Sequence, residues 1–130
     1  MTVFIDTGYF IARIAPRDQW HRKARNAVDP RLRYVTSSLV VNETAALLQV
    51  HGFLSAALEF LSATRRNADI QIVYPDAALQ AEAWELFARH GGAGASPVDC
   101  VSFAIMRRLS IRTAFTFDRH FRAAGFEILR

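Results

Sequence analysis

Four carboxylates stand where their side chains could gather and do chemistry: Asp6, Glu43, Asp99 and Asp118. Asp6 and Asp118 each follow a short apolar run, which predicts a place at the end of a buried strand. In a parallel sheet, ligands bind beyond the carboxyl ends of the strands. Carboxylates gathered there repel and raise one another's pKa values, and divalent cations relieve the repulsion. Oxygen ligands suit Mg²⁺ or Mn²⁺, and such ions held by carboxylates are used for phosphodiester hydrolysis.

Glu43 lies inside an apolar stripe of the helix expected at 38–51. The positions three and four residues away are all apolar: Leu39, Val40, Ala46 and Leu47. We therefore expect the Glu43 carboxylate to be buried or to line a cleft, and a buried unpaired charge is costly. Its partner is either a metal ion or, in the alternative reading, an arginine in a salt bridge.

The other three carboxylates also have purely structural interpretations. Asp6 and Asp118 are suitable N-caps for short helices at 7–13 and 118–124. Asp99 lies three residues after Ser96, with Pro97 at the first helical position, which predicts a capping box. Capping does not exclude a role in the site, and Ser102, one turn later, is a candidate hydrogen-bond donor to Asp99.

The bulk composition indicates one globular domain over residues 1–130, with 52% hydrophobic and 22% charged residues. The formal net charge is +4 and the pI about 10.0. Lys23 is the only lysine, so the positive charge is almost all arginine. Arginine fits phosphate groups, so this excess favours an anionic partner, although an arginine bias of the genome explains it equally well.

Features of cellular location point to a cytoplasmic protein. Cys100 is the only cysteine, so no disulfide forms within the chain, as is typical of a reducing compartment. The start of the chain lacks a basic segment and reaches Asp6 at once, unlike a signal peptide. No apolar run approaches the ~20 residues that cross a bilayer.

Strands and helices are expected to alternate along the chain. Apolar, β-branched runs predict strands at 3–5, 34–36, 70–74, 113–115 and 126–129. Caps and helical spacing predict helices at 7–13, 17–28, 38–51, 53–66, 77–90, 96–109 and 118–125. Residues 91–95, rich in glycine, are expected to form a flexible loop. This alternation predicts an α/β/α sandwich with a mainly parallel central sheet.

Five motifs in order along the chain resemble those of the PIN-domain family, and within it the VapC-type toxins of toxin–antitoxin pairs. They are Val3-Phe4-Ile5-Asp6-Thr7, then Asp18, His21 and Ala24, then Thr36-Ser37 with Val40 and Glu43, then Ser96-Pro97-Val98-Asp99-Cys100, and finally Thr116-Phe117-Asp118-Arg119-His120-Phe121 with Ala124-Gly125-Phe126. None of these motifs is specific alone, but together they span essentially the whole chain.

The resemblance implies an endoribonuclease that uses Mg²⁺ or Mn²⁺ and leaves a 5′-phosphate and a 3′-hydroxyl. Asp6, Glu43 and Asp99 would hold the principal ion, and Asp118 would help to bind a second ion or orient the attacking water. The resemblance also implies that Thr7, Ser37 and Thr116 are hydroxyl donors near the acids. It implies that Arg13 and Arg119 contact phosphate groups. His21 and His120 could touch RNA, but they are left out of the site.

The same resemblance implies two protein partners, a second copy of the chain and an antitoxin whose peptide occupies the catalytic groove. The helices that carry Leu47, Phe53, Leu54 and Leu58 could offer apolar surface to such a partner. For each of these residues, packing in the core is the favoured interpretation.

Three other functions remain open at this point. A phosphatase or phosphoacceptor with Asp6 as nucleophile is disfavoured, because Gly8 replaces the second acid and Lys23 is the only lysine. A non-catalytic PIN-like module would bind RNA or protein, and the presence of all four acids argues against it. A stand-alone processing nuclease without an antitoxin would share the same chemistry.

Overall fold

The computed structural model describes residues 1–14 and 31–129 of the chain. The helix expected at 17–28 lies outside these residues, together with its motif residues Asp18, His21 and Ala24. Within the described ranges, no helix is long and apolar enough to cross a membrane.

Five strands form one sheet in the order β3-β2-β1-β4-β5. They are β1 (Thr2–Ile5), β2 (Arg33–Ser37), β3 (Ile70–Val73), β4 (Thr113–Phe115) and β5 (Glu127–Leu129). Each neighbouring pair in this sheet is parallel, which confirms the predicted sheet. The central strands β1 and β4 are almost continuously apolar, as strands covered on both faces must be.

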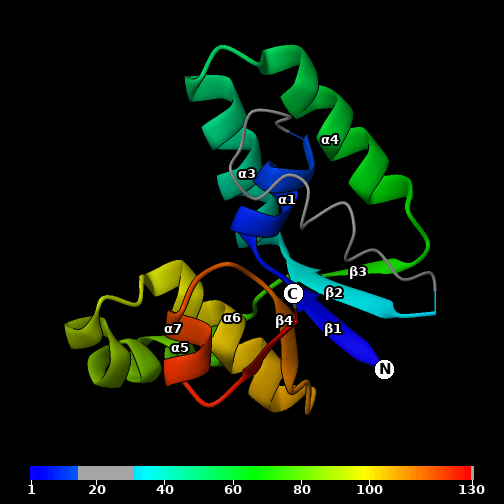
Figure 1. Cartoon of the computed structure of the whole chain (residues 1–130). Coiled ribbons are helices and arrows are strands. Elements are labelled where there is room, and N and C mark those ends of the chain that lie inside the picture. Colours follow the sequence, from blue (N-terminus) through cyan, green and yellow to red (C-terminus); the bar gives the residue numbers. More distant parts are fainter. Residues whose placement is uncertain (15–30, 130) are drawn as a thin grey trace.

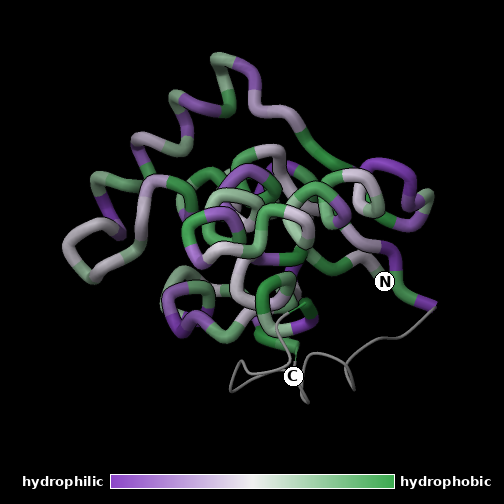
Figure 2. Tube along the Cα trace, turned by 90° about the horizontal axis from the view of Figure 1, so that it is seen from above, coloured by the Kyte–Doolittle hydropathy of each residue, from purple (hydrophilic) through white to green (hydrophobic). Residues whose placement is uncertain are grey.

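Helices cover both faces of the sheet and make the predicted sandwich. They are α1 (Thr7–Ile14), α3 (Ser38–Val50), α4 (Leu54–Arg66), α5 (Ala77–His90), the 3₁₀ helix η1 (Gly91–Ala93), α6 (Pro97–Arg108) and α7 (His120–Ala123). Figure 1 shows α1, α3 and α4 grouped on one side of the strands, and α5, α6 and α7 on the other. Hydrophobic and hydrophilic residues alternate along the trace, as amphipathic helices around a buried sheet require (Figure 2).

The strand order creates a switch point between β1 and β4. From β1 the chain continues to β2 on one side, whereas from β4 it continues to β5 on the other. In open α/β sheets such a point leaves a crevice beyond the carboxyl ends of the two strands. Ile5 pairs with Phe115, so Asp6 and Thr116 leave the sheet side by side.

Aromatic rings fill much of the core beneath this edge. Phe4, Phe103 and Phe121 are fully buried, and the Phe121 ring lies 6.5 Å from that of Phe4 and 5.0 Å from that of Phe103. On the other face, Tyr9 stacks on Phe115 with ring centroids 4.6 Å apart. The start of α1 and the start of α7 are thus both fixed to the sheet.

The helices α3 and α4 leave exposed several apolar residues that were expected to be buried. The buried residues of α3 are Val40, Val41, Thr44 and Leu48, and those of α4 are Ala57, Phe60 and Thr64. Ala46 is exposed, as are four residues for which core packing was favoured: Leu47 (39%), Phe53 (56%), Leu54 (54%) and Leu58 (58%). That interpretation was wrong, because α4 packs on α3 rather than deep in the sandwich and leaves the outer apolar side uncovered.

Candidate active site

Asp6 is the most buried of the four predicted site residues. It follows the last residue of β1, and its backbone N–H donates to Phe115 O at 3.0 Å, which extends the β1–β4 pairing by one residue. The side chain turns into the switch point, where the Thr116 hydroxyl donates to Asp6 Oδ2 at 2.8 Å. Only 7% of Asp6 is exposed.

The environment of Asp6 opposes its negative charge. Burial raises the pKa of Asp6 from 3.8 to about 7; the Thr116 hydrogen bond lowers it, and the charges of Asp99 and Asp118 raise it. These are the influences expected of a carboxylate in a crowded acidic site. A cation at this position would stabilise the ionised form.

Asp99 serves as a cap and as a member of the acidic group. Its Oδ2 accepts from the Ser96 N–H at 2.8 Å, and Ser96 Oγ accepts from the Asp99 N–H at 3.0 Å, which confirms the predicted capping box. Burial raises the pKa of Asp99, the Ser96 backbone N–H lowers it, and Asp118 raises it. Ser102 does not contact Asp99 as expected, because its hydroxyl donates to Val98 O at 3.3 Å.

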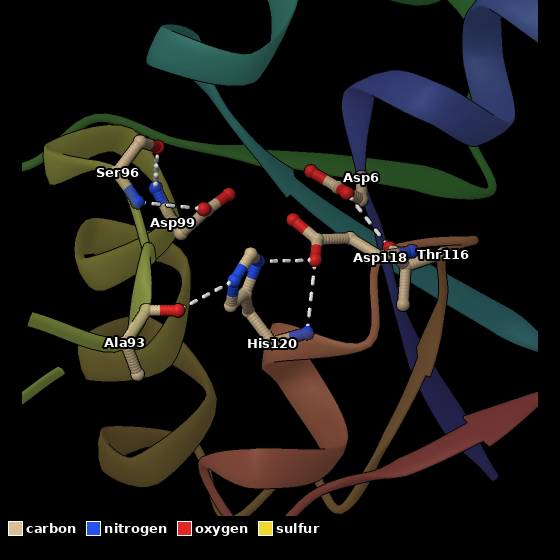
Figure 3. Close-up of polar contacts among 7 residues, drawn as sticks. All are labelled: Asp6, Ala93, Ser96, Asp99, Thr116, Asp118 and His120. Carbon is tan, nitrogen blue, oxygen red and sulfur yellow. Dashed lines mark hydrogen bonds and ion pairs between the residues drawn. The ribbon is translucent and has the colours of Figure 1, made fainter. Parts of the chain in front are cut away.

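Asp118 lies between β4 and α7 and is held by backbone and side-chain contacts. Its N–H donates to Thr116 Oγ1 at 3.0 Å, and its Oδ1 accepts from the His120 N–H at 2.8 Å. This second bond gives Asp118 part of the capping role expected of it. Figure 3 shows the carboxylates of Asp6, Asp99 and Asp118 turned toward the same space.

His120, which the sequence interpretation left out, joins this group. Its Nδ1 lies 2.6 Å from Asp118 Oδ1, and its Nε2 lies 3.0 Å from Ala93 O (Figure 3). Ligand atoms of Asp99, Asp118 and His120 all lie within 4.8 Å of one another. A lone histidine in a short helix gives no sequence signal for this, because one of its partners is a backbone carbonyl 27 residues earlier.

Glu43 is placed on α3, which starts at the same edge of the sheet. The Thr36 hydroxyl donates to Ile5 O at 2.9 Å and holds the end of β2 beside that of β1. Ser37 Oγ then accepts from the Val40 N–H at 3.1 Å and caps α3. Glu43 lies in the second turn and is half-buried, as the lining of a cleft would be.

The structure does not join Glu43 to the other acids by a direct contact. Among residues 1–14 and 31–129, no hydrogen bond or ion pair to its carboxylate is found, so the predicted alternative of an arginine salt bridge has no support there. Glu43 is also not among the principal influences on the pKa of Asp6 or Asp99.

The predicted hydroxyl donors and phosphate-binding arginines have different surroundings in the structure. Thr116 donates to Asp6 as expected, whereas Ser37 is occupied in capping α3. Thr7 Oγ1 is buried and has no hydrogen-bond partner within the described part of the chain. Arg119 is exposed and follows Asp118 in the chain, whereas Arg13 is exposed in a separate pocket that it lines with Asn67 and Asp69.

The donor set fits a hard divalent cation. Carboxylates from β1, α6 and the β4–α7 turn converge, and two of them have raised pKa values. The hydroxyl of Thr7 is buried without a partner among the described residues, although such groups are nearly always hydrogen-bonded. Mg²⁺ and Mn²⁺ prefer this combination of carboxylates with room for water.

Comparisons with known proteins agree with the geometry. The model of the family described as "PIN domain" matches residues 3–127. The chain is 35% identical over 130 residues to the 23S rRNA-specific endonuclease VapC20 of Mycobacterium tuberculosis, and the match covers 98% of each protein.

Two solved structures are similar in fold. The crystal structure of Mycobacterium tuberculosis VapC20, described as a sarcin–ricin loop cleaving toxin, matches with a TM-score of 0.87 and 33% identity over 95% of each chain. FitAcB from Neisseria gonorrhoeae matches with a TM-score of 0.65 and 16% identity, over 100% of this chain and 97% of the other, and so shares the fold.

Proposed function

Since the chain belongs to the PIN-domain family and, within it, to the VapC-type toxins, we propose that it is a metal-dependent endoribonuclease acting as the toxin of a toxin–antitoxin pair. One observation supports this most. Three carboxylates converge at the switch point of the sheet, and one of them, Asp6, has a pKa raised to about 7. Such a site gains from a cation and lies where α/β proteins bind ligands.

Each acid has a proposed role over the single domain 1–130. Asp6, Glu43 and Asp99 hold Mg²⁺ or Mn²⁺, and Asp118 assists with a second ion or orients water. The bound ion would stabilise charge on the phosphate and favour the attack of water on phosphorus. Thr116 keeps the Asp6 carboxylate turned toward the site, and cleavage leaves a 5′-phosphate and a 3′-hydroxyl.

We further propose that the substrate is the sarcin–ricin loop of 23S ribosomal RNA. This proposal is supported by a relative that is 35% identical over nearly the whole chain. That relative is named a 23S rRNA-specific endonuclease, and its crystal structure is described as that of a sarcin–ricin loop cleaving toxin. Arg119, an exposed arginine that follows Asp118 in the chain, and the net charge of +4 suit an RNA backbone. A ribosomal substrate agrees with the cytoplasmic location expected from the sequence.

The test is cleavage of purified ribosomes and of total RNA, with EDTA, Mg²⁺ or Mn²⁺. We expect one metal-dependent cut in 23S RNA, and no cut by Asp6→Asn or Glu43→Gln. Glu59→Gln is the matched control, because Glu59 is an exposed glutamate on the neighbouring helix α4. It should cleave as the wild type does.

Each other result overturns a defined part of the proposal. Metal-dependent cleavage of transfer or messenger RNA alone would retain the nuclease and reject the substrate. An inactive but folded wild type, free of any antitoxin, would favour the non-catalytic binding module. Equal activity in the variants would mean that the site is misplaced.

The exposed side of the α3–α4 hairpin supports a protein partner, which we propose is the antitoxin. The side chains of Leu47, Phe53, Leu54 and Leu58 are 39% to 58% exposed, so they are available to a partner. Co-expression with the product of a short upstream reading frame should give a complex that loses RNA cleavage. Leu54→Asp with Leu58→Asp should weaken this complex but leave cleavage intact. We also propose that the free protein forms a homodimer, which sedimentation in the absence of an antitoxin tests.

A further inference from the structure

We propose that His120 is a positioning residue of the nuclease site, which sets the spacing between Asp99 and Asp118. Its imidazole lies between Asp118 and the segment that leads into α6, and we call these two contacts the His120 bridge. The inference rests on the proposed function, because it assigns a purpose to the spacing of two acids that would hold metal.

The ring contacts both of its neighbours through its nitrogen atoms. Nε2 lies 3.0 Å from Ala93 O, and since a carbonyl oxygen only accepts, Nε2 is the donor in this bond. Nδ1 lies 2.6 Å from Asp118 Oδ1, a close contact that lacks the alignment of a hydrogen bond. One side chain therefore spans two segments that are 27 residues apart.

The glycine-rich segment is shaped to receive this ring. It was expected to be a flexible loop, but it contains the 3₁₀ helix η1, closed by a 3.0 Å bond from the Gly94 N–H to Gly91 O. Gly94 has φ +104°, and a Cβ atom placed there would lie 2.9 Å from His120 Nε2. Only glycine permits both this backbone conformation and this close approach.

The other end of the bridge is held by the core. Phe121 is fully buried between Phe4 and Phe103, so α7 cannot shift without disturbing these rings. The His120 N–H also donates to Asp118 Oδ1, the atom that Nδ1 approaches. The backbone that carries the His120 ring is therefore held in place.

These contacts complete a chain of bonds across the site (Figure 3). It runs from Asp6 through Thr116 and Asp118 to His120 and Ala93. Asp99 lies in the first turn of α6, which begins four residues after Ala93. Among the described residues, its side chain is hydrogen-bonded only within its own capping box. The His120 bridge is thus the side-chain link between the sheet edge and the start of α6.

The test measures Mn²⁺ binding by electron paramagnetic resonance, which needs no RNA cleavage. His120→Ala should weaken Mn²⁺ binding by about 10-fold to 100-fold, the usual effect of removing a group that orients a ligand. His120→Gln, whose amide can still donate to Ala93 O, should recover part of the affinity. His90→Ala is the matched control, because His90 is also half-buried and packs on Phe103. Urea unfolding shows that each variant is folded.

A second variant tests the same bridge from the loop side. Gly94→Ala should also weaken Mn²⁺ binding. In a protein that already carries His120→Ala, Gly94→Ala should reduce the Mn²⁺ affinity less than it does in the wild type. The reason is that the imidazole ring that the new Cβ atom would displace is absent. Fully additive losses would contradict the bridge.

Two further results would overturn the positioning role. Unchanged Mn²⁺ affinity in folded His120→Ala would reject it. A ¹⁴N coupling in the pulsed spectrum of wild-type Mn²⁺ that His120→Ala removes would make His120 a direct ligand instead. The two proposals fail separately: Mn²⁺ binding without RNA cleavage rejects the nuclease, whereas cleavage with unchanged Mn²⁺ affinity in His120→Ala rejects the bridge.

Discussion

The hydroxyl of Thr116 donates a 2.8 Å hydrogen bond to Asp6 Oδ2 across 110 positions of the sequence. Thr116 Oγ1 also accepts a hydrogen bond from the Asp118 N–H at 3.0 Å. One buried hydroxyl therefore orients two of the four acids and lowers the pKa of Asp6 against the effect of burial.

Thr116→Val should weaken metal binding with little change of shape. Without the hydrogen bond, the pKa of Asp6 rises further above its value of about 7, so less of the carboxylate is ionised at neutral pH. We expect Mn²⁺ affinity at pH 7 to fall by roughly 10-fold or more and to recover as the pH is raised. Thr116→Ser keeps the hydroxyl and should resemble the wild type. An unshifted pH profile in Thr116→Val would contradict this role.

The metal-free protein should lose stability as the pH rises toward 7. The pKa of Asp6 is about 7 in the folded chain, against an ordinary value of 3.8, so between these values the folded state keeps a proton that the unfolded state has released. The free energy of unfolding therefore decreases over this range and levels off above it. Asp99, whose pKa is also raised, acts in the same direction.

Urea unfolding in EDTA at pH 5, 7 and 8 measures this dependence. Asp6→Asn should be more stable than the wild type at pH 8 and should flatten the profile. Mn²⁺ at pH 8 should restore the stability of the wild type, because the ion replaces the lost proton. If the free energy of unfolding of Asp6→Asn still decreases with pH, that remaining dependence comes from another titratable group.

Glu43→Gln should separate activity from stability. The carboxylate is half-buried and makes no hydrogen bond or ion pair with the residues that the structure describes, so its loss should change the free energy of unfolding by about 0.5 kcal/mol or less. RNA cleavage should fall by at least ~10-fold, because a metal ligand is lost. A large loss of stability would instead indicate a structural salt bridge.

Phe121→Ala should destabilise the whole domain. Its ring is fully buried against Phe4 and Phe103, and removal of such a ring costs about 3–5 kcal/mol. Phe126→Ala is a suitable comparison, because Phe126 lies 5.7 Å from Phe103 but is only half-buried. In urea unfolding, Phe126→Ala should reduce the free energy of unfolding clearly less than Phe121→Ala does. Equal reductions would mean that α7 is not anchored by Phe121.

Much of the fold was predictable because its elements are set by local sequence. The Ser96 capping box, the strand at 113–115 and the helix at 77–90 were each predicted with little or no error. The orientation of α4 was not, because helical spacing shows that an apolar stripe exists but not which neighbour covers it. Leu54 and Leu58 belong to such a stripe and remain exposed.

The site was predictable where an acid follows a strand or begins a helix. Asp6, Asp99 and Asp118 meet the expectation of a common acidic site. His120 was missed because its role depends on the Ala93 carbonyl and on the backbone of Gly94, neither of which has a side chain that reveals it. The contribution of Glu43 stays a prediction.

The central position of β1 governs when the site can exist. β1 pairs with β4, although most of the described residues lie between these two strands in the sequence. Asp6 therefore lies beside Thr116 and Asp118 only after β1 and β4 have paired. Contacts so distant in sequence form slowly. A chain in which β1 and β4 have not yet paired therefore has its acids but no assembled acidic site.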